Sequence, residues 1–106
     1  MSFNGNEGQM VSLTDGAQWT KNYRDSQNYD GVKSIFYGKN KLNDLLDQQG
    51  CVGIRIYKAI DGEGVPVMVL IGTDEDGNDL LDGYVLERGV PCPNNCGGGG
   101  ISNPLQ

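Results

Sequence analysis

The chain has 106 residues, of which 17 are glycine and 37% are apolar, and its formal net charge is −6. This length is typical of one small domain with a single core. An acidic chain is a poor match for nucleic acid or for an anionic membrane surface, because phosphate binding depends on clustered lysine and arginine. We therefore expect no nucleic acid and no membrane among its partners.

The charge is unevenly distributed along the chain. Residues 1–60 carry seven bases and six acids, whereas residues 61–106 carry one base, Arg88, and eight acids. Acidic turns that keep the protein soluble are the simplest explanation, and a basic partner surface or a cation is the alternative. The first residues lack the pattern of a secretory signal, and the longest apolar stretch, residues 65–72, is too short to span a bilayer. We expect a cytoplasmic protein.

The N-terminal third predicts an arm followed by a helix. Residues 1–10 are rich in glycine and asparagine and are predicted to form a flexible arm. A helix is predicted after Ser12, because Ser12 and Asp15 have the spacing of a capping box. Its apolar side chains form two neighbouring rows that are expected to face a core: Leu13 with Ala17, and Trp19 with Tyr23.

A second helix is predicted over residues 40–49, where leucines at positions 42, 45 and 46 keep the i, i+3, i+4 spacing. Gly50 is expected to cap its C-terminus. The preceding residues 32–37 fit either a short strand or the first turns of a helix.

The strongest pattern is a β-hairpin over residues 51–72. Apolar and other side chains alternate through residues 52–57, and Asp-Gly-Glu-Gly at residues 61–64 favours a turn. Residues 65–72 are apolar on both faces, as in an interior strand, and Pro66 is expected at its start or on an unpaired side. A further strand is predicted over residues 84–87.

These elements predict an α+β fold. We expect one or two N-terminal helices packed on a mainly antiparallel sheet of three or four strands. The predicted organisation is a flexible arm at residues 1–10, a single α+β domain at residues 11–90, and a Gly/Pro-rich tail at residues 91–106.

Three short segments resemble a group of small uncharacterised proteins from Bacteroidota. They are Gln-Gly-Cys-Val-Gly-Ile-Arg-Ile-Tyr at residues 49–57, Val-Leu-Ile-Gly-Thr-Asp-Glu-Asp-Gly-Asn-Asp at residues 69–79, and the dipeptide of Cys92 and Pro93. The resemblance extends over residues 33–96. It implies that hairpin and tail belong to one unit, and it implies no activity.

The acidic run at residues 74–79 begins like a calcium-binding EF-hand loop. Asp74, Asp76 and Asn78 match its first, third and fifth positions, but Asp79 replaces the glycine at position six and Val85 replaces the glutamate at position twelve. A tight turn explains the same residues. A weak cation site that uses Asp74 and Asp76 remains the alternative.

The cysteines leave several alternatives open. Three residues separate Cys92 from Cys96, one more than in the redox motif C-x-x-C, and a zinc site with Cys51 would still need a fourth ligand, because the chain has no histidine. Free or structural thiols, a disulfide between Cys92 and Cys96, and a metal or redox role are all possible. An odd number of cysteines argues against a complete disulfide framework.

A thiol beside a guanidinium would favour thiolate, but Cys51 and Arg55 lie about 13 Å apart along a strand. We expect Cys51 to be a small buried residue and Arg55 to pair with an acid or pack on an aromatic ring. Without histidine or a phosphate-binding loop, no catalytic template fits, and we expect neither an enzyme nor a cofactor.

The sequence therefore favours a non-catalytic protein-interaction or assembly module, which binds a protein partner or associates with itself. The alternative is a metal-binding or redox-responsive thiol protein that uses Cys92 and Cys96.

Overall fold

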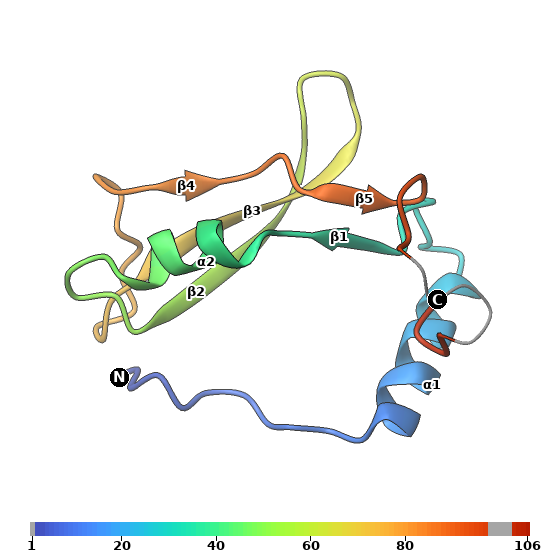
Figure 1. Ribbon diagram of the computed structural model, residues 1–106, viewed down its shortest axis with the longest axis horizontal. Helices are drawn as coiled ribbons and strands as arrows, with labels where there is room; N and C mark the ends of the chain where they lie inside the picture. The colour runs from blue at the N-terminus through green and yellow to red at the C-terminus, as the bar shows by residue number, and fades with distance from the viewer. Residues whose placement is uncertain (1, 98–102) are drawn as a thin grey trace. The chain divides into compact units, whose positions relative to one another are not determined.

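The computed structural model describes residues 2–97 and 103–106. In this part of the chain it contains two helices and two antiparallel sheets, which confirms the α+β class (Figure 1). In chain order the elements are α1 (Leu13–Arg24), β1 (Ser34–Phe36), α2 (Lys39–Leu46), β2 (Gly53–Ile60), β3 (Pro66–Thr73), β4 (Val85–Leu86) and β5 (Val90–Cys92).

The contacts divide the chain into two compact units. The first unit comprises the described residues of Met1–Gly8 and Tyr37–Gly89, and the second comprises those of Gln9–Phe36 and Val90–Gln106. The hairpin therefore lies in the first unit and the cysteine-bearing tail in the second, whereas the resemblance implied one unit for both. Part of the predicted tail, residues 98–102, lies outside the described residues.

The first unit is built on the predicted hairpin. β2 and β3 pair antiparallel over eight residues, from Gly53 opposite Thr73 to Ile60 opposite Pro66. β3 is the central strand, because β4 pairs with its other side. The hairpin, the interior position of β3 and the strand near residues 84–87 are thus confirmed. Pro66 opens β3, a position at which its missing N–H is tolerated.

Helix α2 contacts all three strands of this sheet and provides its most buried side chain (Figure 1). Leu45 has no exposed surface, and Leu70 and Ile71 of β3 are also buried. The leucine spacing thus predicted both the helix and the residue that it buries.

The end of α2 differs from the prediction. The helix stops at Leu46 with Asp47 as its C-cap, so the expectation that Gly50 caps it is wrong. The Gln48 side-chain amide donates to the Leu45 carbonyl at 2.9 Å, and its carbonyl accepts from the Tyr84 amide at 2.9 Å. Gln48 therefore connects the helix end to the chain that leads into β4, which a longer helix would prevent.

Gly72 of β3 lies close to the chain that follows α2. A Cβ atom there would lie 2.8 Å from Gln48 Nε2 and 3.0 Å from Cys51 Sγ. The 2.8 Å approach is closer than real Cβ atoms come, so a larger residue at this position would require the Gln48 side chain to move.

The second unit contains α1 and the two-stranded sheet of β1 and β5. Ser12 caps α1 as predicted, since its Oγ accepts from the Asp15 amide at 3.0 Å. Residues 32–37 contain a strand rather than helical turns, because β1 pairs antiparallel with β5. No residue of α1 is buried, so the expectation that its apolar rows face a core is wrong. The sheet of this unit pairs over only three residues, too short a surface to cover a twelve-residue helix.

Within residues 2–97 and 103–106, no helix has the length and apolar character that crossing a membrane requires.

Leu45 and Leu46 provide a matched test of this core. We expect Leu45→Ala to lower the free energy of unfolding by about 2–5 kcal/mol, because it leaves a cavity between α2 and the sheet. Leu46→Ala, at a side chain that is 44% exposed, should cost less than about 1 kcal/mol. Urea unfolding followed by circular dichroism measures both, and equal losses in the two variants would contradict the packing of α2.

Candidate functional site

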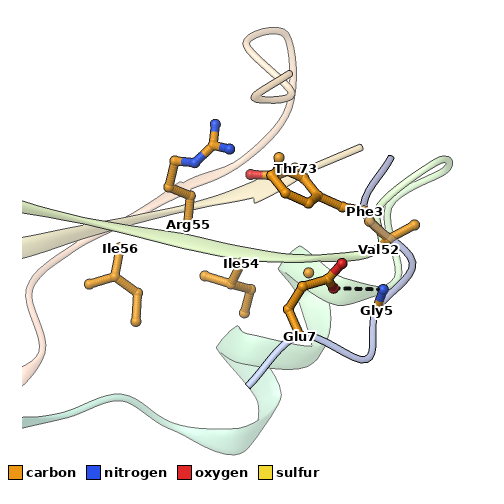
Figure 2. Close-up of a pocket in the computed structure, with 9 residues that line it drawn as sticks. Phe3, Gly5, Glu7, Val52, Ile54, Arg55, Ile56 and Thr73 are labelled. Carbon is orange, nitrogen blue, oxygen red and sulfur yellow. Dashed lines mark hydrogen bonds between the residues drawn. The ribbon is translucent and has the colours of Figure 1, made fainter. Parts of the chain in front are cut away.

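A groove runs along the outer edge of β2 in the first unit. Its volume is about 450 Å³. Figure 2 shows the residues of the N-terminal arm and the strand that line it. Ile54 and Ile56 point to one side of the strand and Arg55 to the other, because side chains alternate along a strand. Phe3, Gly5 and Glu7 form the opposite wall.

The N-terminal residues 2–8 contact the turn that follows β3. The Phe3 amide donates to the Glu75 carbonyl at 2.7 Å. The Phe3 ring lies so close to Gly77 that a Cβ atom there would be 2.9 Å from Phe3 Cε2. The Glu7 carboxylate accepts from the amides of Asn4 and Gly5, at 2.9 and 3.0 Å, and its pKa is lowered mainly by the first of these bonds. The predicted arm thus has defined contacts.

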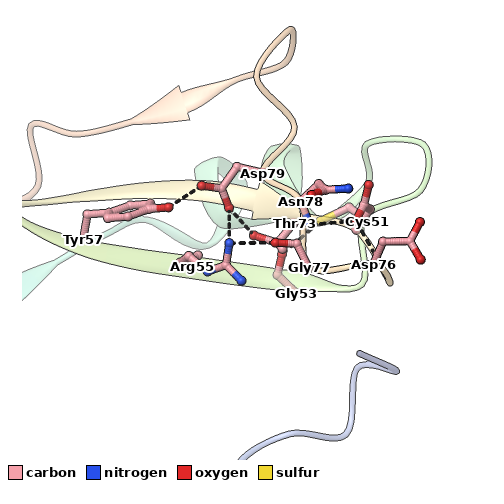
Figure 3. A network of polar contacts seen from close by, with 10 residues as sticks. Cys51, Gly53, Arg55, Tyr57, Thr73, Asp76, Gly77, Asn78 and Asp79 are labelled. Atoms are coloured by element: carbon pink, nitrogen blue, oxygen red, sulfur yellow. Dashed lines mark hydrogen bonds and ion pairs between the residues drawn. The ribbon is translucent and has the colours of Figure 1, made fainter. Parts of the chain in front are cut away.

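Asp79 is the centre of a polar network that shares Arg55 and Thr73 with this groove (Figure 3). Its Oδ1 accepts from Arg55 Nη1 at 2.7 Å and from Thr73 Oγ1 at 3.0 Å, and its Oδ2 accepts from the Tyr57 hydroxyl. Arg55 Nη1 also donates to the Gly77 carbonyl at 2.9 Å. One carboxylate therefore links both strands of the hairpin to the turn that follows it.

The strand alternation explains why these groups meet. Arg55 and Tyr57 are two residues apart on β2 and so share one face, and Thr73 ends β3 where it forms a bridge with Asp79. Asp79 is 14% exposed, and Thr73 is buried with its hydroxyl satisfied by Asp79. The buried hydroxyl of Thr73 therefore has a hydrogen-bond partner.

The hydrogen bond from the Tyr57 hydroxyl, followed by those from Thr73 and Arg55, holds the pKa of Asp79 below its ordinary value. Asp79 is therefore ionised at neutral pH and accepts hydrogen bonds only. A carboxylate with this environment has no proton to give near pH 7, so it is unsuited to act as a general acid.

The sequence offered an acid or an aromatic ring as the partner of Arg55, and Arg55 contacts one of each. It forms an ion pair with Asp79, and its guanidinium carbon lies 5.9 Å from the centroid of the Phe3 ring. The structure does not bring it to Cys51, whose Sγ donates to the Gly53 carbonyl at 3.2 Å. Cys51 is a free cysteine and only half-buried, rather than fully buried as expected.

Asp74 and Asp76 lie in one tight turn. Asp74 Oδ1 accepts from the amides of Asp76 and Asn78, at 3.0 and 2.9 Å, and Gly77 has a positive φ of 84°. This is the turn that the sequence offered as an explanation, and it engages a carboxylate oxygen that a cation would need. Among the described residues, no group of three or more histidine, cysteine, aspartate or glutamate side chains is placed to hold a metal ion.

Cys92 and Cys96 form a disulfide in the second unit. Of the alternatives that the sequence left open, this is the one the structure contains. Cys92 is buried at the end of β5, and its carbonyl accepts from the Lys33 amide at 2.6 Å. The Cys96 carbonyl accepts from Gln106 Nε2 at 2.7 Å. The four candidate residues thus form two separate pairs, one in each unit.

Sequence reasoning missed Asp79 and Phe3 as members of the site. An acid partner for Arg55 was expected, but eight acids follow residue 60. The turn at residues 74–78 brings Asp79 back beside Thr73, and this placement selects Asp79. Phe3 gave no signal, because an aromatic residue in a glycine-rich arm has no periodic pattern.

Asp79→Asn tests the network. We expect it to lower the free energy of unfolding at pH 7 by about 1–3 kcal/mol, because Arg55 loses its charged partner. The lowered pKa means that ionised Asp79 stabilises the fold; this contribution is complete above the unfolded-state pKa of about 3.9 and is lost as pH falls through the lower folded-state value. The difference from wild type should therefore shrink below about pH 4.

The matched control is Asp76→Asn, at an exposed carboxylate of the same turn. It should change stability by less than about 0.5 kcal/mol at any pH. Denaturant unfolding between pH 3 and about pH 7 measures both variants, and a pH-independent loss in Asp79→Asn would contradict the role of the ionised carboxylate.

Comparison with models of known protein families, with curated protein sequences and with solved structures found no match to this chain.

Proposed function

We propose that this chain is a non-catalytic protein-interaction or assembly module. The observation that carries the proposal is β2, an eight-residue strand at the edge of the first unit's sheet. Ile56, Tyr57 and Ile60 on this strand are exposed, the first and last by 60% and 73%. A long edge strand with exposed apolar side chains can pair with a strand of another polypeptide.

The opposite edge of the sheet is a weaker candidate. β4 pairs with β3 over only two residues. Tyr84 and Val85 are exposed there, but two residues offer too few main-chain groups to hold a partner strand. The interaction function is therefore assigned to the β2 edge.

The polar network supports a structural role rather than catalysis. Asp79 is ionised and accepts three side-chain hydrogen bonds, so its oxygens are already engaged. The chain has no histidine to serve as a base near neutral pH. Chemistry that needs an activated nucleophile finds no activating partner in the network.

A capture experiment tests the proposal. The full chain is immobilised, incubated with native host extract, and analysed in parallel by size-exclusion chromatography with light scattering. We expect either a stoichiometric partner or self-association at micromolar concentration. An unrelated protein of the same net charge is the control for electrostatic capture. A monomer that retains nothing beyond the control would contradict the module function.

A second candidate function, a redox-responsive thiol protein, rests on the disulfide between Cys92 and Cys96. The bond closes a short loop whose Cys92 end is buried, which favours a structural cross-link over an exposed catalytic dithiol. A reducing cytoplasm, the expected location, would open such bonds. The response would then be the loss of order around β5.

Reduction in native buffer tests this candidate. We expect a gain of two hydrogen atoms in the intact mass and faster hydrogen exchange at the Lys33 amide, which bonds to the Cys92 carbonyl. In Cys51→Ala, which keeps the disulfide, reductant should have the same effect. A bond that resists reductant until the protein is denatured would end the redox reading and leave a structural cross-link.

A further inference from the structure

The outer edge of β2 is open along part of its length. At the Val52 end the N-terminal residues lie against it: a Cβ atom on Gly5 would be 3.1 Å from the Val52 carbonyl oxygen. Beyond Arg55 the exposure rises, and residues 56–58 and 60 are all exposed. The accessible stretch is therefore residues 56–60, long enough for one partner strand of average length.

The two faces of this stretch differ in character. Ile56, Lys58 and Ile60 share one face, because side chains alternate along the strand, and Tyr57 and Ala59 share the other. A strand added to the edge would place its side chains about 5 Å from those directly opposite. A partner strand on the first face therefore needs an apolar side chain opposite Ile56 and another opposite Ile60. Between them, it needs a side chain that complements Lys58.

Lys58, the middle residue of this stretch, carries its charge. β2 carries Arg55 and Lys58 and no acid. Within the described residues the ion pairs are Arg55 with Asp79 and Lys21 with Asp25, so Lys58 has no ion pair there. An exposed ammonium between two isoleucines is complemented by a carboxylate from the partner.

A second copy of β2 does not supply that carboxylate. Antiparallel pairing of two β2 strands would bring together four basic side chains, of which only the two copies of Arg55 have an acidic partner in Asp79. Like charges across a strand pair destabilise it. The charge pattern thus favours a different polypeptide over self-pairing.

We propose that the edge of β2 at residues 56–60 binds an extended segment of another protein, in which a carboxylate faces Lys58 between two aliphatic side chains. This inference rests on the proposed interaction function and names its surface and partner. The partner adds a strand to the sheet through main-chain hydrogen bonds, and the side chains opposite Ile56, Lys58 and Ile60 provide specificity.

A designed peptide is the probe. Its core reads valine, threonine, glutamate, threonine, valine, and a second peptide carries lysine in place of glutamate. Fluorescence anisotropy with the full chain should show saturable binding of the glutamate peptide and at least about fivefold weaker binding of the lysine peptide. Lys58→Glu should reverse this preference, a readout that a change in stability alone would not produce.

The apolar contacts have a matched control. Ile56→Lys should abolish binding of the glutamate peptide, whereas Leu81→Lys, at a side chain that is 80% exposed and lies outside β2, should leave binding unchanged. Unchanged melting temperatures in both variants exclude unfolding as the cause.

Three results would overturn the inference. They are equal binding of both peptides, no effect of Lys58→Glu, and a dimer in light scattering that Ile56→Lys dissociates, which would assign the edge to a second copy. If host extract yields a partner that Ile56→Lys retains as well as wild type, the β2 surface is wrong while the module function stands.

Discussion

The eight-residue register between β2 and β3 is the constraint on which the first unit depends. It places Arg55 and Tyr57 on one face, where they meet Asp79, and it leaves Ile54 and Ile56 on the other. A slip of one residue would exchange the two faces, so the ion pair, the groove and the packing under α2 would be lost together. The alternation of apolar residues along β2 favours this register, because it places their side chains on the face that α2 covers.

Asp79 gathers the side chains of Arg55, Tyr57 and Thr73 into one polar cluster. Its carboxylate satisfies the buried Thr73, neutralises Arg55 and holds the Tyr57 hydroxyl. Each of these bonds stabilises the ionised form, so the group that gathers the network is also the one that cannot act as an acid near neutral pH. The network connects β2 to the end of β3 and to the turn that follows it.

The two units differ in how many apolar side chains their described residues bury. The first unit buries Leu45, Leu70 and Ile71 between helix and sheet. The second has a three-residue strand pair and a helix with no buried residue, and Cys92 is the buried apolar side chain among its described residues. The disulfide between Cys92 and Cys96 cross-links this small core. This also explains why changes at the cysteines and at the β2 edge are expected to act on different parts of the chain.

The sequence by itself determined the local elements: the capped helix after Ser12, the leucine-spaced helix, the hairpin and its turns. These depend on periodicity and turn chemistry within a few residues. It also indicated that Arg55 would find an acid. Only the tertiary structure decided which acid, that α1 buries no residue, that Cys92 pairs with Cys96, and that the arm lies beside the edge of β2. These features depend on distances between residues far apart in the sequence, and composition and spacing do not record such distances.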